Sequence, residues 1–258
     1  MSIREDEAIV LGAKPYSNTS LIAALLTRKA GKVRLVAEGV RSPKSRVGVG
    51  LEPATHVHLE WFESPKRELG ALRKCETLTV FRRPWEDFEA MQAAGRFLRA
   101  VDRVLGPHEG EEAHFGLLRA ALEALEEGAA PGGLEALFMI LLLQSLGLAP
   151  APRYCEECAK TPGGEAALLD TAAGELRCLR CPRKPAQGVR LRAGAVATLQ
   201  EALRLGPKCL RTLQVLPSLQ PEVRQAAEAF LAYHTGASFS PKRRGAPLPA
   251  LTGKRRGR

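Results

Sequence analysis

The sequence predicts an α+β multidomain protein: an N-terminal OB-fold β-barrel, followed by an α-helical domain that a four-cysteine zinc module interrupts. Three observations support this prediction. Short apolar, strand-like runs fill the first 80 residues, whereas apolar residues after Trp85 recur at three- and four-residue steps. Between the helical segments, two Cys-x-x-Cys pairs are separated by nineteen residues, which is the spacing of a four-thiolate zinc site.

The N-terminal segment reads as five strands, over residues 7–11, 20–27, 32–40, 55–62 and 72–81. A Gly-containing loop at 28–31 indicates a hairpin between the second and third strands. In the fourth strand Val57, Leu59 and Trp61 alternate with polar residues and are expected to face the interior. Five strands in about 80 residues suit a small closed barrel such as an OB-fold, although an SH3-like barrel would give nearly the same pattern.

Two groups of side chains in this segment have more than one interpretation. Trp61, Phe62 and Phe81 are candidates for stacking on bases, but core packing is the favoured interpretation. His56 and His58 share one face at strand spacing and resemble a pair of metal ligands. A polar, outward-facing pair is the favoured interpretation for them.

The remaining chain has helical periodicity. An amphipathic helix is predicted from Trp85 to Leu105, a second at 115–125, and an apolar, buried central helix at 134–146. Further helices are expected at 194–205, 207–216 and 221–233, after the cysteine pairs. We place the domain boundaries at 1–82 (barrel), 83–150 (first helical part), 151–189 (zinc module), 190–238 (second helical part) and 239–258 (basic tail, expected to be disordered).

The cysteine pairs define the candidate metal ligands Cys155, Cys158, Cys178 and Cys181. Each two-residue gap lets one turn aim two sulfurs at the same ion, and the long gap lets the second pair complete a tetrahedron. Four thiolates leave no open position, so we expect one structural Zn²⁺ that fastens the last helices against the central one. Two redox dithiols or two disulfides are the alternative. The remaining cysteines, Cys75 and Cys209, are isolated, which fits a reducing cytoplasm.

Charge is distributed unevenly along the chain. The net charge of +10 combines +4 over residues 1–80, +2 from Arg82 and Arg83, −7 over 84–149, +4 over 150–239 and +7 over the tail from residue 240. Basic ends around an acidic middle indicate a polyanionic partner, although a solvated basic surface is the simpler alternative. With few stacking aromatics, we expect phosphate-led binding with little sequence preference. The residues expected to bind nucleic-acid phosphates are Arg28, Lys29, Lys32, Arg34, Arg41, Lys44 and Arg46 of the barrel, and Lys242, Arg243 and Arg244 of the tail.

No catalytic motif is recognisable, so a binding protein is favoured over an enzyme. No signal peptide is visible, and the longest apolar run, at 136–143, is too short to span a bilayer, so no membrane partner is expected. Two other classes remain open: an RNA-binding or ribosome-associated zinc protein, and an enzyme of nucleic-acid metabolism. A direct comparison of DNA and RNA affinities separates the first from a DNA-binding protein.

Three stretches carry a resemblance to the RecO family of bacterial recombination mediators. The segment 20–46 resembles the family's second and third strands and the basic loop after them, and the cysteine pairs lie where many members have a zinc module. The closing segment 230–236, followed by Pro241 to Arg244, is similar to the family's last helix and basic end, though richer in Ala and Ser. The resemblance implies a cytoplasmic, nucleoid-associated protein that binds single- and double-stranded DNA and anneals complementary strands. It also implies work with RecR to replace single-strand-binding protein by RecA, while the acidic middle either meets partner proteins or solvates the bundle.

Overall fold

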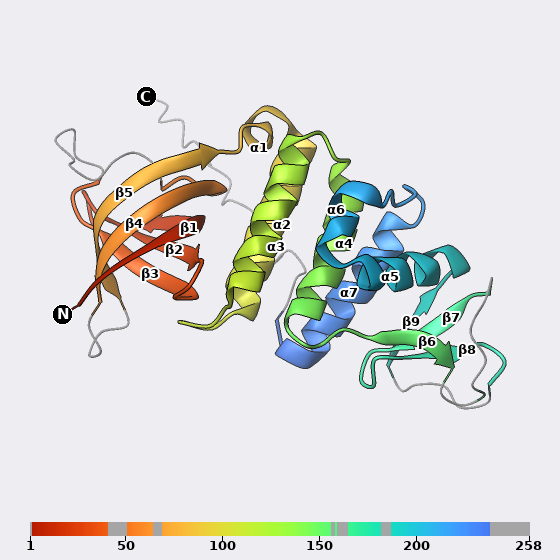
Figure 1. Ribbon diagram of the computed structural model, residues 1–258. Coiled ribbons are helices and arrows are strands. Elements are labelled where there is room, and N and C mark those ends of the chain that lie inside the picture. The colour runs from red at the N-terminus through yellow and green to blue at the C-terminus, as the bar shows by residue number, and fades with distance from the viewer. Residues whose placement is uncertain are drawn as a thin grey trace, which may run out of the picture.

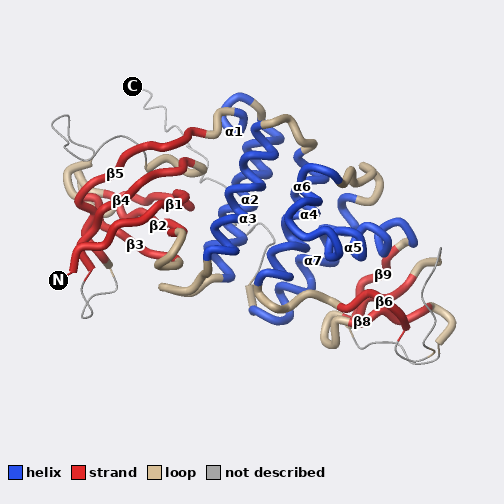
Figure 2. The backbone as a smooth tube through the Cα atoms, in the orientation of Figure 1, coloured by secondary structure: helices blue, strands red, loops and turns tan. Residues whose placement is uncertain are grey.

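The computed structural model describes residues 2–40, 51–63, 69–155, 158, 165–181 and 187–237. Its strands gather at the two ends of the molecule, and the helices lie between them (Figure 2). A five-stranded barrel forms the N-terminal end and a small four-stranded sheet the other (Figure 1). The predicted fold class is thereby confirmed. Among the described residues, no helix is long and apolar enough to cross a membrane.

The barrel consists of β1 (Ser2–Pro15), β2 (Leu21–Thr27), β3 (Lys32–Ala37), β4 (Thr55–Glu63) and β5 (Gly70–Val80), in the order β1-β2-β3-β5-β4. The long strand β1 pairs with β4 along its first half and with β2 along its second half, with a bulge between Val10 and Gly12. A short parallel seam joins β3 to β5. This arrangement is that of an OB-fold, which resolves the choice that the sequence left open.

Alternation along the strands sorts side chains between the interior and the outer surface. On β4, Val57, Leu59 and Trp61 are buried in the barrel core, as predicted. Phe81 is buried as well, in the core shared with the helices, and Phe62 is half-buried. The interpretation of Trp61 and Phe81 as core residues is therefore confirmed, and neither ring is exposed for stacking on a base.

The helical region contains α1 (Arg83–Glu86), α2 (Phe88–Val104), α3 (Glu112–Glu126) and α4 (Pro131–Ser145), and, after the small sheet, α5 (Ala193–Leu205), the 3₁₀ turn η1 (Gly206–Lys208), α6 (Cys209–Thr212) and α7 (Gln220–Thr235). α2 and α3 stand between the barrel and the other helices (Figure 1). Every residue from Leu134 to Leu143 of α4 is buried, because α2, α3, α5 and α7 surround this helix. The prediction of a buried central helix is confirmed.

The start of the helical region differs from the single helix predicted over 85–105. The chain breaks at Asp87, whose carboxylate caps α2 by accepting the N–H groups of Glu89 and Ala90. Trp85 of α1, and Phe88 and Met91 in the first turn of α2, are exposed rather than buried. The small side chains of α2 allow close packing of the opposite face. That buried face consists of Ala90, Ala93, Ala94, Phe97, Leu98, Ala100 and Val101.

The cysteine pairs belong to a small sheet of β6 (Ala151–Cys155), β7 (Ala167–Asp170), β8 (Glu175–Cys178) and β9 (Gly188–Leu191), in the order β6-β8-β7-β9. Leu169, Leu176 and Leu191 of this sheet join the core of the helices. Gly174, at a φ of +72°, lies against the ring of Phe230 on α7, where a Cβ would be 3.1 Å from the ring. The sheet is thus packed tightly onto the last helix, in line with the fastening role expected from the sequence.

Candidate metal centre and nucleic-acid interface

The four predicted metal ligands lie together at one end of the small sheet. Cys155 ends β6 and Cys178 ends β8, and their partners Cys158 and Cys181 follow three residues later. All four sulfur atoms lie within 4.8 Å of one another. In the part of the chain that the structure describes, this is the one group of three or more side chains suited to hold a metal ion.

The sulfur separations fit a tetrahedral ion. The Sγ atoms of Cys155 and Cys181 are 3.7 Å apart, as are those of Cys158 and Cys178. Four thiolates at about 2.3 Å from a zinc ion would be about 3.8 Å from each other. A disulfide would need about 2.05 Å, which is shorter even than the 3.1 Å between Cys178 and Cys181. The geometry therefore favours one shared metal ion over two disulfides.

The backbone supports this cluster, and the other two cysteines stay apart from it. The N–H of Cys178 donates to the Sγ of Cys155 at 3.3 Å, a bond that suits a thiolate acceptor. Cys75 lies in the barrel core and Cys209 in the helical core. Burial raises the pKa of each of these two thiols to about 11, so both are protonated and unreactive at neutral pH.

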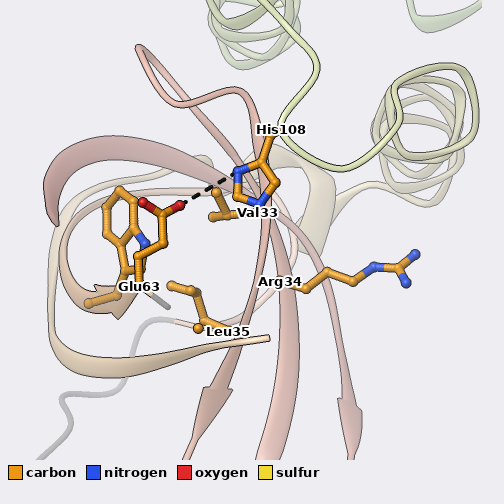
Figure 3. Close-up of a pocket in the computed structure, with 7 residues that line it drawn as sticks. Val33, Arg34, Leu35, Glu63 and His108 are labelled. Carbon is orange, nitrogen blue, oxygen red and sulfur yellow. Dashed lines mark ion pairs between the residues drawn. The ribbon is translucent and has the colours of Figure 1, made fainter. Parts of the chain in front are cut away.

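The cations predicted to bind DNA, apart from the buried Lys32, fall into three groups. Arg28 is partly exposed, but its guanidinium forms an ion pair with Glu112 of α3 at 2.5 Å. Lys29 and Arg34 are exposed, and neither side chain has an ion pair with another described residue. Arg34 points away from the barrel wall (Figure 3). The remaining predicted residues, Arg41, Lys44, Arg46, Lys242, Arg243 and Arg244, lie outside the described residues.

Lys32 requires a correction. Its side chain is only 4% exposed, and its Nζ donates to the carbonyl oxygen of Asp102 at 2.6 Å. The Asp102 carboxylate lies 3.4 Å from the same ammonium. Lys32 therefore joins the barrel to α2 and is not placed to contact a phosphate. The sequence could not reveal this, because Asp102 is 70 positions further along the chain.

The two histidines on the outer face of β4 form separate pairs with acids of β1. Nε2 of His56 is 3.2 Å from a carboxylate oxygen of Glu7, and Nε2 of His58 is 3.1 Å from Glu5. These carboxylates come from a strand distant in sequence. The four side chains do not converge on one point suited to a metal. His58 is partly exposed, as expected of a polar, outward-facing residue, whereas His56 is buried because it packs against Phe115 of α3.

Two hollows adjoin the predicted DNA-binding residues. A cavity of about 10 Å³, room for about one water, lies at the β3–β5 seam, where Glu63 and His108 face each other at 3.7 Å (Figure 3). A wider hollow of about 350 Å³ lies beside Arg28 and Lys29, and its other lining residues are Glu5, Asp6, Glu7 and His58. With three acids, this hollow is a poor place for a phosphate.

An OB-fold barrel that precedes helices bearing a four-cysteine centre defines a class of multidomain protein with a candidate nucleic-acid-binding barrel and a separate candidate metal site. The chain belongs to the RecO family: the family model "Recombination protein O N terminal" matches residues 1–81, and "Recombination protein O C terminal" matches residues 85–243.

Curated relatives agree with this membership over most of the chain. The protein is 33% identical to "DNA repair protein RecO" of Nocardioides sp., over 89% of this chain and 93% of the relative. It is 33% identical to the protein of the same name from Rubrobacter xylanophilus, over 78% and 84% of the two chains. With the Moorella thermoacetica protein of that name the identity is 28%, over 88% and 85%. The resemblance seen in the sequence is therefore confirmed.

Proposed function

We propose that this protein is a DNA-binding mediator of recombination in DNA repair, without catalytic activity of its own. The observation that carries the proposal is the OB-fold barrel of a RecO family chain, with Lys29 and Arg34 exposed on its surface and Trp61 and Phe81 buried. Surface cations bind phosphates whatever the base sequence, and buried aromatics cannot add base preference by stacking. Such a surface suits a protein that binds any strand exposed by damage.

Binding of single- and double-stranded DNA and annealing of complementary strands follow from the same electrostatics. Two strands repel each other through their phosphates, and a protein that neutralises some of these charges lowers the repulsion. Because phosphate contacts do not occupy the base edges, the bases remain able to pair. A basic surface with little base readout therefore supports annealing as well as binding.

The proposed partners are RecR, single-strand-binding protein and RecA, with the chain helping RecA to replace single-strand-binding protein. This part of the proposal rests on family membership. The segment 84–149 carries a net charge of −7, so much of it would repel DNA and suits contact with proteins instead. A role on bacterial DNA would place the protein in the cytoplasm, at the nucleoid.

We propose that Cys155, Cys158, Cys178 and Cys181 hold one Zn²⁺ with a structural role. The ion would supply a cross-link between the ends of β6 and β8 and the turns that follow them. Since this sheet packs on α7 and the helical core, the cross-link would stabilise the helical half and not contact DNA directly.

The test is the salt dependence of binding to a labelled single-stranded oligonucleotide, with annealing of its complement followed in the same samples. We expect tight binding that weakens linearly in log salt, and faster annealing than without protein. The double variant Lys29→Gln/Arg34→Gln should bind all sequences more weakly, with a slope reduced by about 1.4 if both cations contact phosphates. No salt-dependent binding and no faster annealing would exclude the proposal. Clearly tighter binding of RNA of the same sequence would favour the RNA-binding alternative.

A further inference from the structure

The exposed face of α2 carries a row of three arginines. Arg96, Arg99 and Arg103 follow one another at three- and four-residue steps, so their side chains lie on one side of the helix. Arg99 and Arg103 are exposed, and Arg96 is partly exposed. The row lies on the side opposite Phe97, Leu98 and Val101, which pack into the core.

The composition of this region makes the row unusual. The segment 84–149 contains four basic residues against eleven acidic ones, and three of the four basic residues stand in this row. Like charges at three- and four-residue steps on one helix face repel and destabilise the helix. Charges gathered at a cost within an acidic segment indicate a surface suited to an anion rather than general solvation.

Arg99 lies in a locally positive environment. Burial lowers the pKa of Arg99 and the neighbouring charges of Arg96 and Arg103 lower it further. Its guanidinium lies against Gly95, where a Cβ would be 3.1 Å from Nη1. No ion pair of Arg99 with another described residue is found, so its charge is not balanced by a contacting carboxylate in that part of the chain.

Arg96, unlike Arg99, forms an ion pair with a buried carboxylate. Its Nη1 is 2.8 Å from the carboxylate of Glu135 on α4, which is 2% exposed, and Arg224 of α7 approaches the same carboxylate at 3.5 Å. Through these ion pairs, Glu135 connects α2, α4 and α7 and holds the Arg96 end of the row in place. Arg99 and Arg103 are the exposed members of the row.

The other end of the row adjoins the barrel. Asp102, the neighbour of Arg103, binds Lys32 of β3, and Arg34 lies two residues further along that strand. Two backbone hydrogen bonds reinforce this contact: Lys32 N–H donates to the carbonyl of Glu109, and His108 N–H donates to the carbonyl of Lys32, each at 2.8 Å. Barrel and α2 are therefore joined firmly enough for one ligand to contact both.

We propose that Arg96, Arg99 and Arg103 of α2 form a second phosphate-binding surface, which extends the nucleic-acid contact of the barrel onto the helical half. This inference rests on the proposed function, because the ligand is the same DNA strand. From Arg96 to Arg103 the row spans about 10 Å along the helix axis, which corresponds to about three nucleotides of one strand. The guanidiniums of Arg99 and Arg103 would pair with backbone oxygens and read no bases, while Arg96 adds its charge from its place on Glu135.

The test compares two double variants of the full-length chain on a labelled single-stranded oligonucleotide over a range of salt concentrations. Arg99→Gln/Arg103→Gln removes the outward charges and leaves Arg96 on Glu135. Arg119→Gln/Arg204→Gln is the matched control: it also removes two surface arginines, Arg204 exposed and Arg119 partly exposed, each paired with an acid of its own helix. We expect the first variant to bind all sequences more weakly, with a log–log slope about 1.4 units shallower than wild type, and the control to keep the wild-type slope.

A further variant separates charge from packing. Arg99→Lys/Arg103→Lys keeps both charges, so it should retain most of the wild-type slope, and thermal unfolding should show all three variants folded. Wild-type affinity and slope for Arg99→Gln/Arg103→Gln, alongside weaker binding by Arg34→Gln, would overturn the second surface and leave the proposed function intact. Equal losses in the control pair would also overturn it, because net charge alone would then explain the effect. If the wild-type chain did not bind the oligonucleotide, both the second phosphate-binding surface and the proposed function would be wrong.

Discussion

Lys32 and Asp102 join the barrel to the helices, because the buried ammonium of Lys32 donates to the backbone carbonyl of Asp102 at 2.6 Å. Lys29 stands three residues earlier in the same hairpin, and its side chain is exposed. Two lysines of one basic hairpin therefore have different roles. One stabilises the junction between barrel and helices, and the other is available to a ligand.

Replacement of these two lysines should separate stability from DNA binding. Lys32→Ala removes the donor to Asp102 and leaves polar groups unpaired at the junction, so we expect a loss of about 1–3 kcal/mol in the free energy of unfolding. Lys29→Ala should leave stability within about 0.5 kcal/mol, because an exposed side chain is removed. Denaturant unfolding gives both values, and oligonucleotide titration should show the salt slope reduced in Lys29→Ala. Equal stability of the two variants would contradict the assigned role of Lys32.

Glu135 should be among the acids most important for stability. Its carboxylate is buried between Arg96 and Arg224, and burial raises its pKa while the two arginines lower it. Glu135→Gln keeps the shape but leaves Arg96 without its carboxylate partner and Arg224 with Glu228 alone, at 3.9 Å, so we expect a loss of about 3 kcal/mol. Glu86→Gln, at an exposed position of α1, is the control for removal of one negative charge. Thermal and denaturant unfolding measure the stability of both variants. A Glu135→Gln protein as stable as wild type would show that the ion pairs of Glu135 with Arg96 and Arg224 do not contribute to the free energy of unfolding.

Local chemistry explains which features the sequence predicted well. The alternation of Val57, Leu59 and Trp61 requires a strand with one buried face, and these three side chains are buried as predicted. The cysteine spacing favours two turns that face each other, and the four sulfur atoms lie within 4.8 Å of one another. The burial of α4 was also predictable, because this helix is apolar on all faces and such a helix is stable only in the interior of a protein.

Contacts between distant segments explain what the sequence did not predict. The burial of Lys32 depends on Asp102, and the pairing of His58 depends on Glu5 of another strand. The break at Asp87, whose side chain caps α2, divides the one helix that the periodicity of 85–105 predicted. The arginine row of α2 was visible as spacing, but the overall acidity of segment 84–149 concealed it.

Acid should destabilise the junction between α3 and the barrel. Burial lowers the pKa of His114 below its usual value of 6.5, and burial likewise lowers that of His56, which packs against Phe115. Each histidine is therefore neutral in the folded state and gains a proton more readily when unfolded. Stability from this source is fully present above about pH 6.5 and is lost as the pH falls from there toward the lowered folded pKa.

The variant His114→Asn tests this pH dependence. Nδ1 of His114 accepts the N–H of Glu111 at 3.0 Å, and an Asn oxygen offers an acceptor at a similar position that does not titrate. We expect the wild-type melting temperature to fall between pH 7.5 and pH 5.5, and the fall to be smaller in His114→Asn. Parallel pH profiles of variant and wild type would show that His114 does not contribute.

Thiol accessibility should reveal the cysteine centre and its metal. Cys75 and Cys209 are buried, and with a pKa of about 11 each they should resist alkylation in the folded protein, whereas the four clustered thiols should be protected by a metal. We expect mass spectrometry after alkylation to count almost no modified cysteines in the metal-loaded protein, four after a chelator, and six after denaturation.

The variant Cys178→Ser supplies the matching stability test. Loss of one ligand should release the metal and lower the melting temperature of the helical half, because β8 ends at this residue and packs on the core. Cys75→Ser in the barrel core is the control, since it should retain the full metal content even where packing suffers. A Cys178→Ser protein with wild-type stability, or six reactive thiols in the untreated chain, would show that the four sulfurs do not form a structural metal centre.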